Sequence, residues 1–321
     1  MRVFVTGGTG LVGSLLMKRL RERGDHVVLL TRRPEAATHL AGANITIVNG
    51  DPGQPGPWMD SVAGCDAVVN LAGEGIFNRR WSQEFKDLIL TSRIKSTDNI
   101  VAAMLAGRAS DGGHDPSLAR PANETGRGRV LINASAVGIY GPHGDEELTE
   151  DALSGIDFLA KVCSDWEKAA QAASVHGVRV VFLRTGIVLD KAGGALAQMM
   201  MPFKMFVGGK VGSGKQWMSW IHNEDEVGLI LFALDHSEIS GPLNACAPNP
   251  VTNREFAAAL GAALGRPSFF PTPGFMLRVM VGEAAEIITT GQRVFPKKAQ
   301  AAGYVFKFKG VEAALRDLLA K

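Results

Sequence analysis

The sequence predicts an α/β protein in which a doubly wound parallel sheet is followed by a smaller C-terminal α/β substrate domain. Strand-like runs rich in Val, Ile and Leu alternate with amphipathic stretches through residues 1–190, and a glycine-rich turn directly follows the first run. This alternation is typical of a parallel sheet flanked by helices. With 321 residues, 46% of them hydrophobic, the chain can bury a sizeable core.

The strands and the first helix can be assigned in chain order. Between the first two runs, Leu11, Leu15, Leu16 and Leu20 recur at near-helical spacing, and Gly24 lies where a helix would end. The first two strands and this helix therefore form a βαβ unit. The six runs that we expect to form strands are VFVTG, HVVLLT, ITIVNG, AVVNLAG, VLINASA and VRVVFLRTG.

The domain boundary follows from where this rhythm stops. We predict that residues 1–190 form the nucleotide-binding domain and that residues 216–245 return to it. Residues 191–321 form the smaller substrate domain, which contains helix-like stretches near 253–264 and 310–320.

The first strand leads into a glycine-rich turn. Gly7, Gly10 and Gly13 form the pattern GxxGxxG between a β-branched strand and an apolar helix. Backbone amides in this context can approach a pyrophosphate at the helix N-terminus, so the pattern predicts a Rossmann-type dinucleotide site. The alternative is a tight turn without a ligand. We expect the site to include three further residues of the turn and the helix start, Thr9, Leu11 and Val12.

The end of the second strand favours NADP(H) as the cofactor. An NAD site usually places an Asp or Glu there to accept hydrogen bonds from the ribose, whereas this chain has Thr31, Arg32 and Arg33. A guanidinium can hold a 2′-phosphate by charge-assisted hydrogen bonds. A pair of solvated loop arginines is the alternative. Asp51, after the third strand, is a candidate for the adenine amino group or an ordinary turn residue.

Composition and charge exclude several classes of partner. The formal net charge of +2, with acids and bases interspersed, offers no basic surface for nucleic acid or an anionic membrane, and we expect a small-molecule substrate instead.

The cysteines and the first residues favour the cytoplasm. Cys65, Cys163 and Cys246 form no CxxC pair, and no leader precedes the first strand. The acidic run 145–151 lacks EF-hand spacing and predicts no metal site. The polar segment 106–128 is expected to be a surface excursion.

Several motifs in order resemble those of a known superfamily. The chain is similar to an extended short-chain dehydrogenase/reductase, and more narrowly to its atypical "epimerase family" branch, whose members are labelled nucleoside-diphosphate-sugar epimerases. The match covers nearly the whole chain. The motifs that carry it are VFVTGGTGLVG (3–13), NLAGE (70–74), NRRW (78–81), NASAVGIYG (133–141), SDWEKAA (164–170), LRTGIVLD (183–190), GSGKQWMSWIHNEDEV (212–227), LNACAPNPVTNREF (243–256) and GQRVFPKKAQAAGYVF (291–306).

The resemblance implies a dinucleotide across the carboxyl ends of the strands. It implies that Leu71 and Ala72, followed by Gly73, lie beside the adenosine half of the cofactor. It also implies that Arg93 lies near the phosphates and Val188 near the nicotinamide. Leu71 and Val188 fit equally well as apolar residues of the sheet core.

The usual acid/base pair of the superfamily is absent. That pair is a tyrosine followed four residues later by lysine, whose ammonium lowers the pKa of the phenol. Gly144 stands four residues after Tyr140, and alignment on the SDWEKAA helix puts Leu159 and Cys163 at the positions of the pair. Ser135 and Tyr140 are the remaining candidates by chain position. Ser135 is one residue out of step with the usual serine. An unassisted phenol is a poor base, so a structural role is the alternative for Tyr140.

Other charged and aromatic residues have alternative roles. Glu74 and the residues 79–81 follow the fourth strand, where they could reach a substrate or form an exposed turn. The loop 208–216 contains GxxxxGK but lacks the Ser or Thr of a P-loop, so we do not expect an ATPase. His222 and Asp225 fit packing roles better than catalysis.

Two functions remain open from the sequence. The first is an NADP(H)-dependent oxidoreductase or epimerase-like enzyme that acts on a small polar molecule, for example a sugar nucleotide, held between the domains. The second is a non-catalytic NADP(H)-binding sensor, which the absence of the Tyr-Lys pair favours. The sequence predicts neither the substrate nor the oligomeric state.

Overall fold

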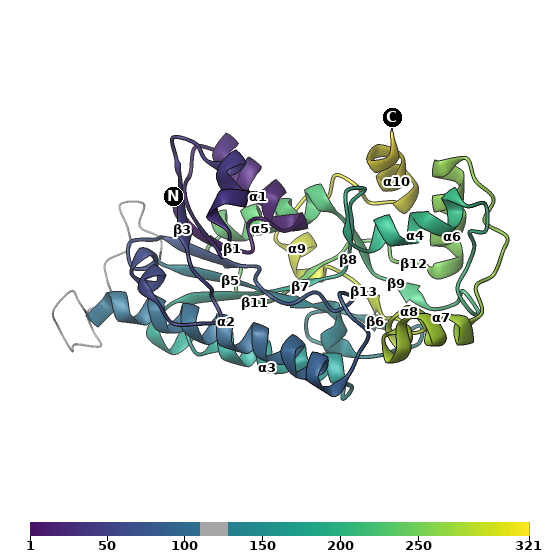
Figure 1. Cartoon of the computed structure of the whole chain (residues 1–321), viewed down its shortest axis with the longest axis horizontal. Helices are drawn as coiled ribbons and strands as arrows, with labels where there is room; N and C mark the ends of the chain where they lie inside the picture. The colour runs from purple at the N-terminus through teal and green to yellow at the C-terminus, as the bar shows by residue number, and fades with distance from the viewer. Residues whose placement is uncertain (110–127, 321) are drawn as a thin grey trace.

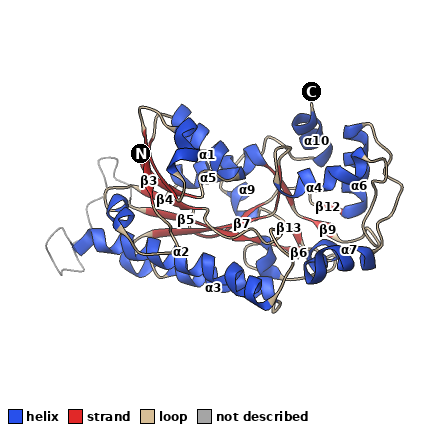
Figure 2. Ribbon diagram, in the orientation of Figure 1, coloured by secondary structure: helices blue, strands red, loops and turns tan. Residues whose placement is uncertain are grey.

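The computed structural model describes residues 1–109 and 128–320 and is built around one seven-stranded sheet (Figures 1 and 2). Neighbouring strands are all parallel, in the order β11-β7-β5-β4-β1-β2-β3, which confirms the predicted doubly wound sheet. The strand order reverses at β1 and β4, so their carboxyl ends open the crevice where such sheets bind ligands. The strands are β1 (Arg2–Thr6), β2 (His26–Thr31), β3 (Ile45–Asn49), β4 (Ala67–Asn70), β5 (Val130–Ala136), β7 (Arg179–Thr185) and β11 (Gly241–Ala245).

Helices cover both faces of this sheet. α1 (Leu11–Glu22) and α5 (Asn223–Asp235) pack on one face, and α2 (Gln83–Ala109) and α3 (Phe158–Gln171) lie along the other (Figure 1). Because the strands are buried on both faces, they are apolar almost throughout rather than alternating. The first face buries, among others, Val5, Leu16, Leu20, Leu29, Leu183 and Ile230. The second buries Phe4, Trp58, Ile100, Met104 and Leu131.

The C-terminal part has its own apolar cluster. It is formed by α4 (Gly194–Lys204), α6 (Asn253–Leu264) and α10 (Val311–Leu319), which meet around Trp220 and Phe256. Both helices expected here, 253–264 and 310–320, are present as α6 and α10. Three short strand pairs accompany them: β8 (Ile187–Leu189) with β10 (Trp220–His222), β9 (Trp217–Met218) with β12 (Val251–Thr252), and β6 (Glu147–Leu148) with β13 (Arg293–Val294).

The chain comes back to the large sheet after its excursion into the C-terminal part. α5 packs against α1, and β11 extends the sheet beside β7. The division into domains near residue 190 stays a prediction, and the proposed excursion 106–128 lies mostly outside the described residues. The remaining elements are η1 (Pro34–Leu40), η2 (Pro57–Val62), η3 (Val137–Tyr140), η4 (Ser174–His176), α7 (Gly274–Val281), η5 (Gly282–Ala284), α8 (Ala285–Thr289) and α9 (Lys297–Ala301).

The described residues lack two features, a membrane-spanning helix and a cluster of metal-ligating side chains. None of their helices is both long and apolar enough to cross a membrane. Nor do they contain a group of three or more His, Cys, Asp or Glu side chains that could hold a metal ion.

Candidate functional site

The glycine-rich turn between β1 and α1 has no room for side chains. Gly7 has a left-handed φ of +69°, and a Cβ there would lie 2.7 Å from the carbonyl oxygen of Leu71. A Cβ on Gly13 would lie only 2.1 Å from the carbonyl oxygen of Gly7. The amide of Gly10 donates to that same carbonyl at 2.9 Å and closes the turn. Glycine is therefore required at 7 by conformation and at 13 by close approach.

The N-terminus of α1 is free to receive an anion. Its N-cap residue is Gly10, which has no side chain to accept from the first amides, and the first turn carries no acidic residue. The unpaired amides and the positive end of the helix dipole both face the carboxyl edge of β1. This is the arrangement that binds phosphate groups at helix N-termini.

A cavity of about 470 Å³ opens beside this helix terminus. We call it the glycine-turn cavity. It brings together nine residues that the sequence predicted for the cofactor: Gly7, Thr9, Gly10, Thr31, Arg32, Asp51, Leu71, Ala72 and Gly73. These residues come from the ends of β1, β2, β3 and β4, which the parallel sheet places along one edge.

The two predicted arginines lie differently. Arg32 is exposed and lines the cavity, whereas Arg33 is the N-cap residue of η1 and is not among the lining residues. The amide of Arg33 donates to Thr31 Oγ1 at 3.2 Å. Asp51 lines the cavity, and its Oδ1 accepts from the amide of Gly53 at 2.9 Å in a local turn.

Arg93 lies directly behind the cavity wall. A Cβ on Gly73 would be 3.3 Å from the guanidinium carbon of Arg93. This guanidinium donates to the carbonyl oxygen of Ile89 at 2.9 Å and lies 5.0 Å from the ring centre of Trp166, and burial lowers its pKa. It forms no ion pair within residues 1–109 and 128–320, although the nearby charge of Glu74 favours its charged form.

Three other predicted cofactor residues do not line the cavity. Leu11 points toward the start of α4, where a Cβ on Gly194 would lie 3.0 Å from it. Val12 packs on the core cluster beneath α1. Val188 is in β8, is paired with Ile221 of β10 and is partly buried against the same cluster. Their places in the cofactor site stay predictions.

Ser135 and Tyr140, the predicted catalytic candidates, belong to one buried polar network. Ser135 Oγ donates to Glu167 Oε1 at 2.7 Å, and Glu167 holds Arg184 through two hydrogen bonds of 2.9 Å. Arg184 Nη1 donates to the hydroxyl of Tyr140 at 3.0 Å, and that hydroxyl donates to Asn244 Oδ1 at 2.7 Å. The network ties β5, α3, β7 and β11 together.

This network makes Tyr140 a poor candidate for proton transfer. Tyr140 is fully buried, and burial raises the pKa of its phenol to about 12, against the opposing effect of Arg184. The Cys163 thiol is also buried, and desolvation raises its pKa to about 12. Leu159 beside it has no titratable group. The geometry therefore places Ser135 and Tyr140 in a buried network and offers no acid/base pair at Leu159 and Cys163, and catalytic roles for Ser135 and Tyr140 stay predictions.

Comparison with known proteins identifies the family. Residues 3–246 match the model of the NAD dependent epimerase/dehydratase family. The chain belongs to this family. Residues 272–318 match a separate model, a domain of unknown function (DUF1731), so the epimerase-family segment is followed by a second recognised unit. The resemblance that we drew from the motifs is confirmed.

Relatives of this family member extend over its whole length. It is 41% identical over 323 residues to the chloroplastic Arabidopsis thaliana homolog of epimerase family protein SDR39U1, covering 99% of this chain and 87% of that protein. The structure of human epimerase family protein SDR39U1 with NADPH is 33% identical, with a TM-score of 0.80 and 99% of each chain covered. A nucleoside-diphosphate sugar epimerase from Corynebacterium glutamicum is 32% identical, with a TM-score of 0.74, covering 99% of this chain and 58% of that one. Because one relative is chloroplastic, the cytoplasm stays a prediction for this family member.

Residues after β4 in this epimerase-family chain make mainly internal contacts. Glu74 lines the cavity and accepts from Asn78 Nδ2 at 2.8 Å. Trp81 donates to the carbonyl oxygen of Ile76 at 2.8 Å and packs edge-on against Phe158. Arg79 and Arg80 are exposed, and they stay candidates for a substrate contact.

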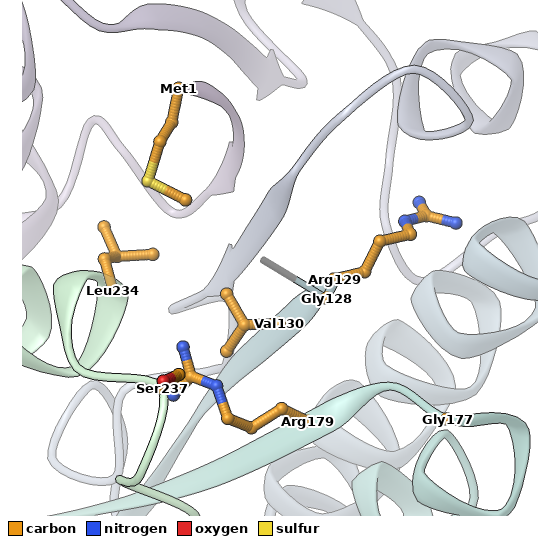
Figure 3. A pocket seen from close by; sticks show the side chains of 8 residues that line it. All are labelled: Met1, Gly128, Arg129, Val130, Gly177, Arg179, Leu234 and Ser237. Atoms are coloured by element: carbon orange, nitrogen blue, oxygen red, sulfur yellow. The ribbon is translucent and has the colours of Figure 1, made fainter. Parts of the chain in front are cut away.

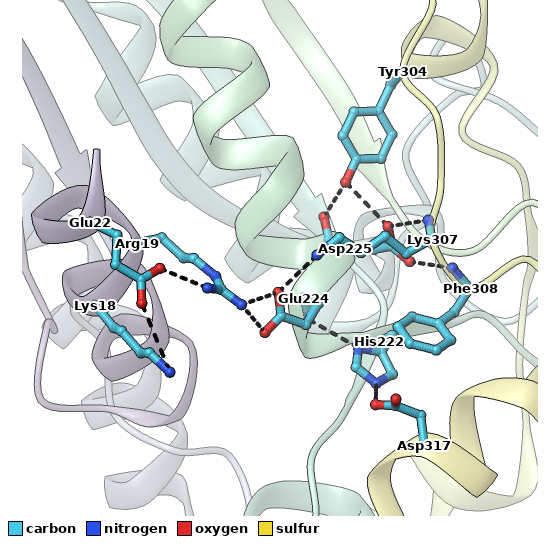
Figure 4. Close-up of polar contacts among 10 residues, drawn as sticks. All are labelled: Lys18, Arg19, Glu22, His222, Glu224, Asp225, Tyr304, Lys307, Phe308 and Asp317. Atoms are coloured by element: carbon cyan, nitrogen blue, oxygen red, sulfur yellow. Dashed lines mark hydrogen bonds and ion pairs between the residues drawn. The ribbon is translucent and has the colours of Figure 1, made fainter. Parts of the chain in front are cut away.

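His222 and Asp225 make packing contacts at the start of α5 (Figure 4). His222 is the N-cap residue, and its Nδ1 accepts from the amide of Glu224 at 3.1 Å. Asp225 accepts from the amides of Lys307 and Phe308 at 2.8 and 2.9 Å. Asp225 therefore holds the C-terminal segment in place, and the ring of His222 stacks on Phe308 of the same segment. In the GxxxxGK loop region, Trp217 donates to Asp145 Oδ1 at 2.7 Å.

A second, smaller cavity lies at the opposite end of the sheet (Figure 3). It has a volume of about 190 Å³ and contains two arginines. Arg129 donates to the carbonyl oxygens of Val62, Cys65 and Met104, and Arg179 donates to those of Ala233 and Ile239. Because both side chains bind backbone carbonyls, this cavity has the character of a packing feature.

The sequence missed one wall of the glycine-turn cavity. This wall is a polar face of α2. Polar residues three and four positions apart in the TSRIKS segment were the available signal that they share one face of a helix. The additional lining residues are Leu30, Pro52, Gly53, Gln54, Glu74, Leu88, Thr91, Ser92, Lys95 and Ser96.

Proposed function

We propose that this protein binds NADP(H) in the glycine-turn cavity. The observation that carries the proposal is the position of Arg32, an exposed cation that shares one cavity with the free N-terminus of α1. An anion-binding helix terminus recognises the pyrophosphate of either dinucleotide, whereas a cation at the end of the second strand recognises a 2′-phosphate. The NADPH in the structure of the human relative supports the same assignment.

The remaining predicted residues divide along the cofactor. Gly7, Gly10 and Arg93 are assigned to the pyrophosphate, because the amides at the start of α1 and the guanidinium behind Gly73 would compensate its charge. Leu71 and Ala72 pack against the adenosine half. The proposal also assigns Asp51 to the adenine amino group and Val188 to the nicotinamide. Leu11 and Val12 would contact the cofactor only through their backbone at the start of α1.

We propose further that the protein is an NADP(H)-dependent oxidoreductase or epimerase-like enzyme for a small polar substrate. The nicotinamide, when bound, supplies or accepts the hydride. The chain positions the substrate between the carboxyl edge of the sheet and the C-terminal part, a usual place for small ligands. The proton that accompanies the hydride is exchanged without Tyr140, whose hydroxyl is buried and bonded on both sides.

A specific observation favours a second candidate, a non-catalytic NADP(H) sensor. Leu159 and Cys163 stand at the positions of the usual acid/base pair, and neither can exchange a proton at neutral pH. A protein that only reports the state of the cofactor does not need this pair.

Cofactor titration tests the binding proposal. We expect the parent protein to bind NADPH at least about tenfold more tightly than NADH, since a charge-assisted phosphate contact is worth roughly 1.5–3 kcal/mol. Arg32→Ala is expected to remove most of this difference. Arg33→Ala is the matched control, because its side chain does not line the cavity, and it should retain the preference. Equal affinities of the parent for both cofactors would refute the assignment.

Isotope transfer separates the enzyme from the sensor. The protein is incubated with NADPH that carries deuterium stereospecifically at C4 of the nicotinamide, together with a panel of small carbonyl compounds. An enzyme transfers the label to one product and from one face of the ring. If the label stays on NADPH across the panel while NADPH still binds, the sensor function is favoured instead.

A further inference from the structure

The α2 wall of the glycine-turn cavity carries a cation that no motif had indicated. Lys95 is exposed, lines the cavity and has no side-chain hydrogen bond or ion pair to any residue of the described chain. Most surface lysines are simply solvated. Because Lys95 lines a cavity instead, its position decides which part of a bound dinucleotide it would face.

Hydrogen bonds along α2 fix where Lys95 lies. Ser92 Oγ accepts from the amide of Glu74, and Ser96 Oγ donates to Asn70 Oδ1, so this part of the helix passes the end of β4. One turn after Lys95, Asn99 Nδ2 donates to the carbonyl oxygen of Pro52 at 2.8 Å, in the loop after β3. Lys95 is therefore placed beside the loop 51–54, on the adenosine side of the cavity.

Arg32 lines the same end of the cavity from another element. It follows β2, whose neighbour in the sheet is β3, so the loop after β3 lies close to both cations. The acids nearby make local hydrogen bonds: Asp51 accepts from the amide of Gly53, and Glu74 accepts from Asn78. Two cations from separate elements thus line one space, and neither forms an ion pair with Asp51 or Glu74, the two acids that line it as well.

We propose that Lys95 and Arg32 together bind the 2′-phosphate of NADP(H), so that Lys95 is a second determinant of cofactor specificity. This inference rests on the proposed function. A 2′-phosphate carries about two negative charges at neutral pH, and two cations compensate it better than one. Arg32 provides planar, forked donors, and Lys95 provides a mobile point charge that follows the phosphate.

The competing role for Lys95 is a contact with the pyrophosphate, which NADH also has. The two roles differ in what they predict. A pyrophosphate contact strengthens the binding of NADPH and NADH alike, whereas a 2′-phosphate contact strengthens only the binding of NADPH.

The experiment measures dissociation constants for NADPH and NADH with Lys95→Gln and Lys95→Arg in the full-length chain. We expect Lys95→Gln to weaken NADPH binding about tenfold and NADH binding less than about twofold, and Lys95→Arg to keep most of the NADPH affinity. Lys168→Gln, an exposed lysine of α3 outside the cavity, is the matched control and should change neither. Competition by 2′,5′-ADP, but not by 5′-AMP, is expected to weaken in parallel with NADPH binding.

The outcomes are distinguishable. Equal weakening of NADPH and NADH by Lys95→Gln would assign Lys95 to the pyrophosphate and overturn the inference. No change for either cofactor would overturn it as well. In both cases a parent protein that still prefers NADPH, and loses this preference with Arg32→Ala, leaves the proposed function standing. A parent protein without the preference defeats the proposed function itself.

Discussion

At the scale of single residues, the most unusual group is a carboxyl buried without a charge partner. Glu226, in the first turn of α5, is 1% exposed, and its Oε1 accepts from Thr185 Oγ1 at 2.7 Å. Its Oε2 is buried without any hydrogen bond within the described structure. Burial raises the pKa of this carboxyl to about 8, and the bond from Thr185 only partly opposes the effect. Glu226 is therefore largely protonated at neutral pH.

This buried acid predicts a pH-dependent stability. Because the folded-state pKa lies above the unfolded value of 4.5, the stability from this group is complete below pH 4.5 and is lost as the pH rises toward 8. At pH 7 the loss is on the order of 3 kcal/mol. We expect Glu226→Gln to raise the melting temperature at pH 7–8 and to flatten its decline across this range, as measured by thermal denaturation. The exposed Glu238→Gln is the control, and a decline in Glu226→Gln as steep as in the parent would contradict the assignment.

Single residues also show where sequence reasoning ends. Gly7 and Gly13 could be predicted because their need for glycine is local to one turn. The hydrogen-bond network around Ser135 and Tyr140 could not be predicted, because Glu167, Arg184 and Asn244 come from three other elements and meet only in the folded sheet. Lys95 was missed for a similar reason, since an exposed lysine on a helix gives no sign of the loop that lies opposite.

At the scale of elements, the sequence predicted helices and strands that are determined by nearby residues, such as capping residues and apolar periodicity. The helix expected at 253–264 is α6, which begins with a capping box between Thr252 and Glu255 and ends at Gly265 in the left-handed conformation. The strand β11 (Gly241–Ala245) was not among the six predicted runs. Its segment, GPLNA, has little β-branched character and forms a strand because it pairs with β7 at the sheet edge.

At the scale of the whole molecule, one carboxylate links α1 to the C-terminal segment (Figure 4). Glu224 at the start of α5 accepts two hydrogen bonds from Arg19 of α1, at 2.6 and 2.7 Å, and one from Lys307 at 3.2 Å. Burial alone would raise the pKa of Glu224, but the bonds from Arg19 and Lys307 outweigh it and lower the pKa. Three segments that are distant in sequence are thus joined through one ionised side chain.

We expect Glu224→Gln to lower the free energy of unfolding by about 1–2 kcal/mol at pH 7, a value already reduced because Arg19 and Lys307 are partly exposed to solvent. Because the folded-state pKa is lowered, this stability is present above the unfolded value of 4.5 and is lost as the pH falls through the folded-state pKa, so the difference between parent and variant at pH 7 should disappear at acid pH. Urea denaturation at both pH values measures the difference.

Glu22→Gln is the matched control. It also removes a bond to Arg19, but one within α1, and should lower the free energy of unfolding by no more than about 0.5 kcal/mol. Equal losses for the two variants would mean that the link between segments adds nothing beyond a local helix pair.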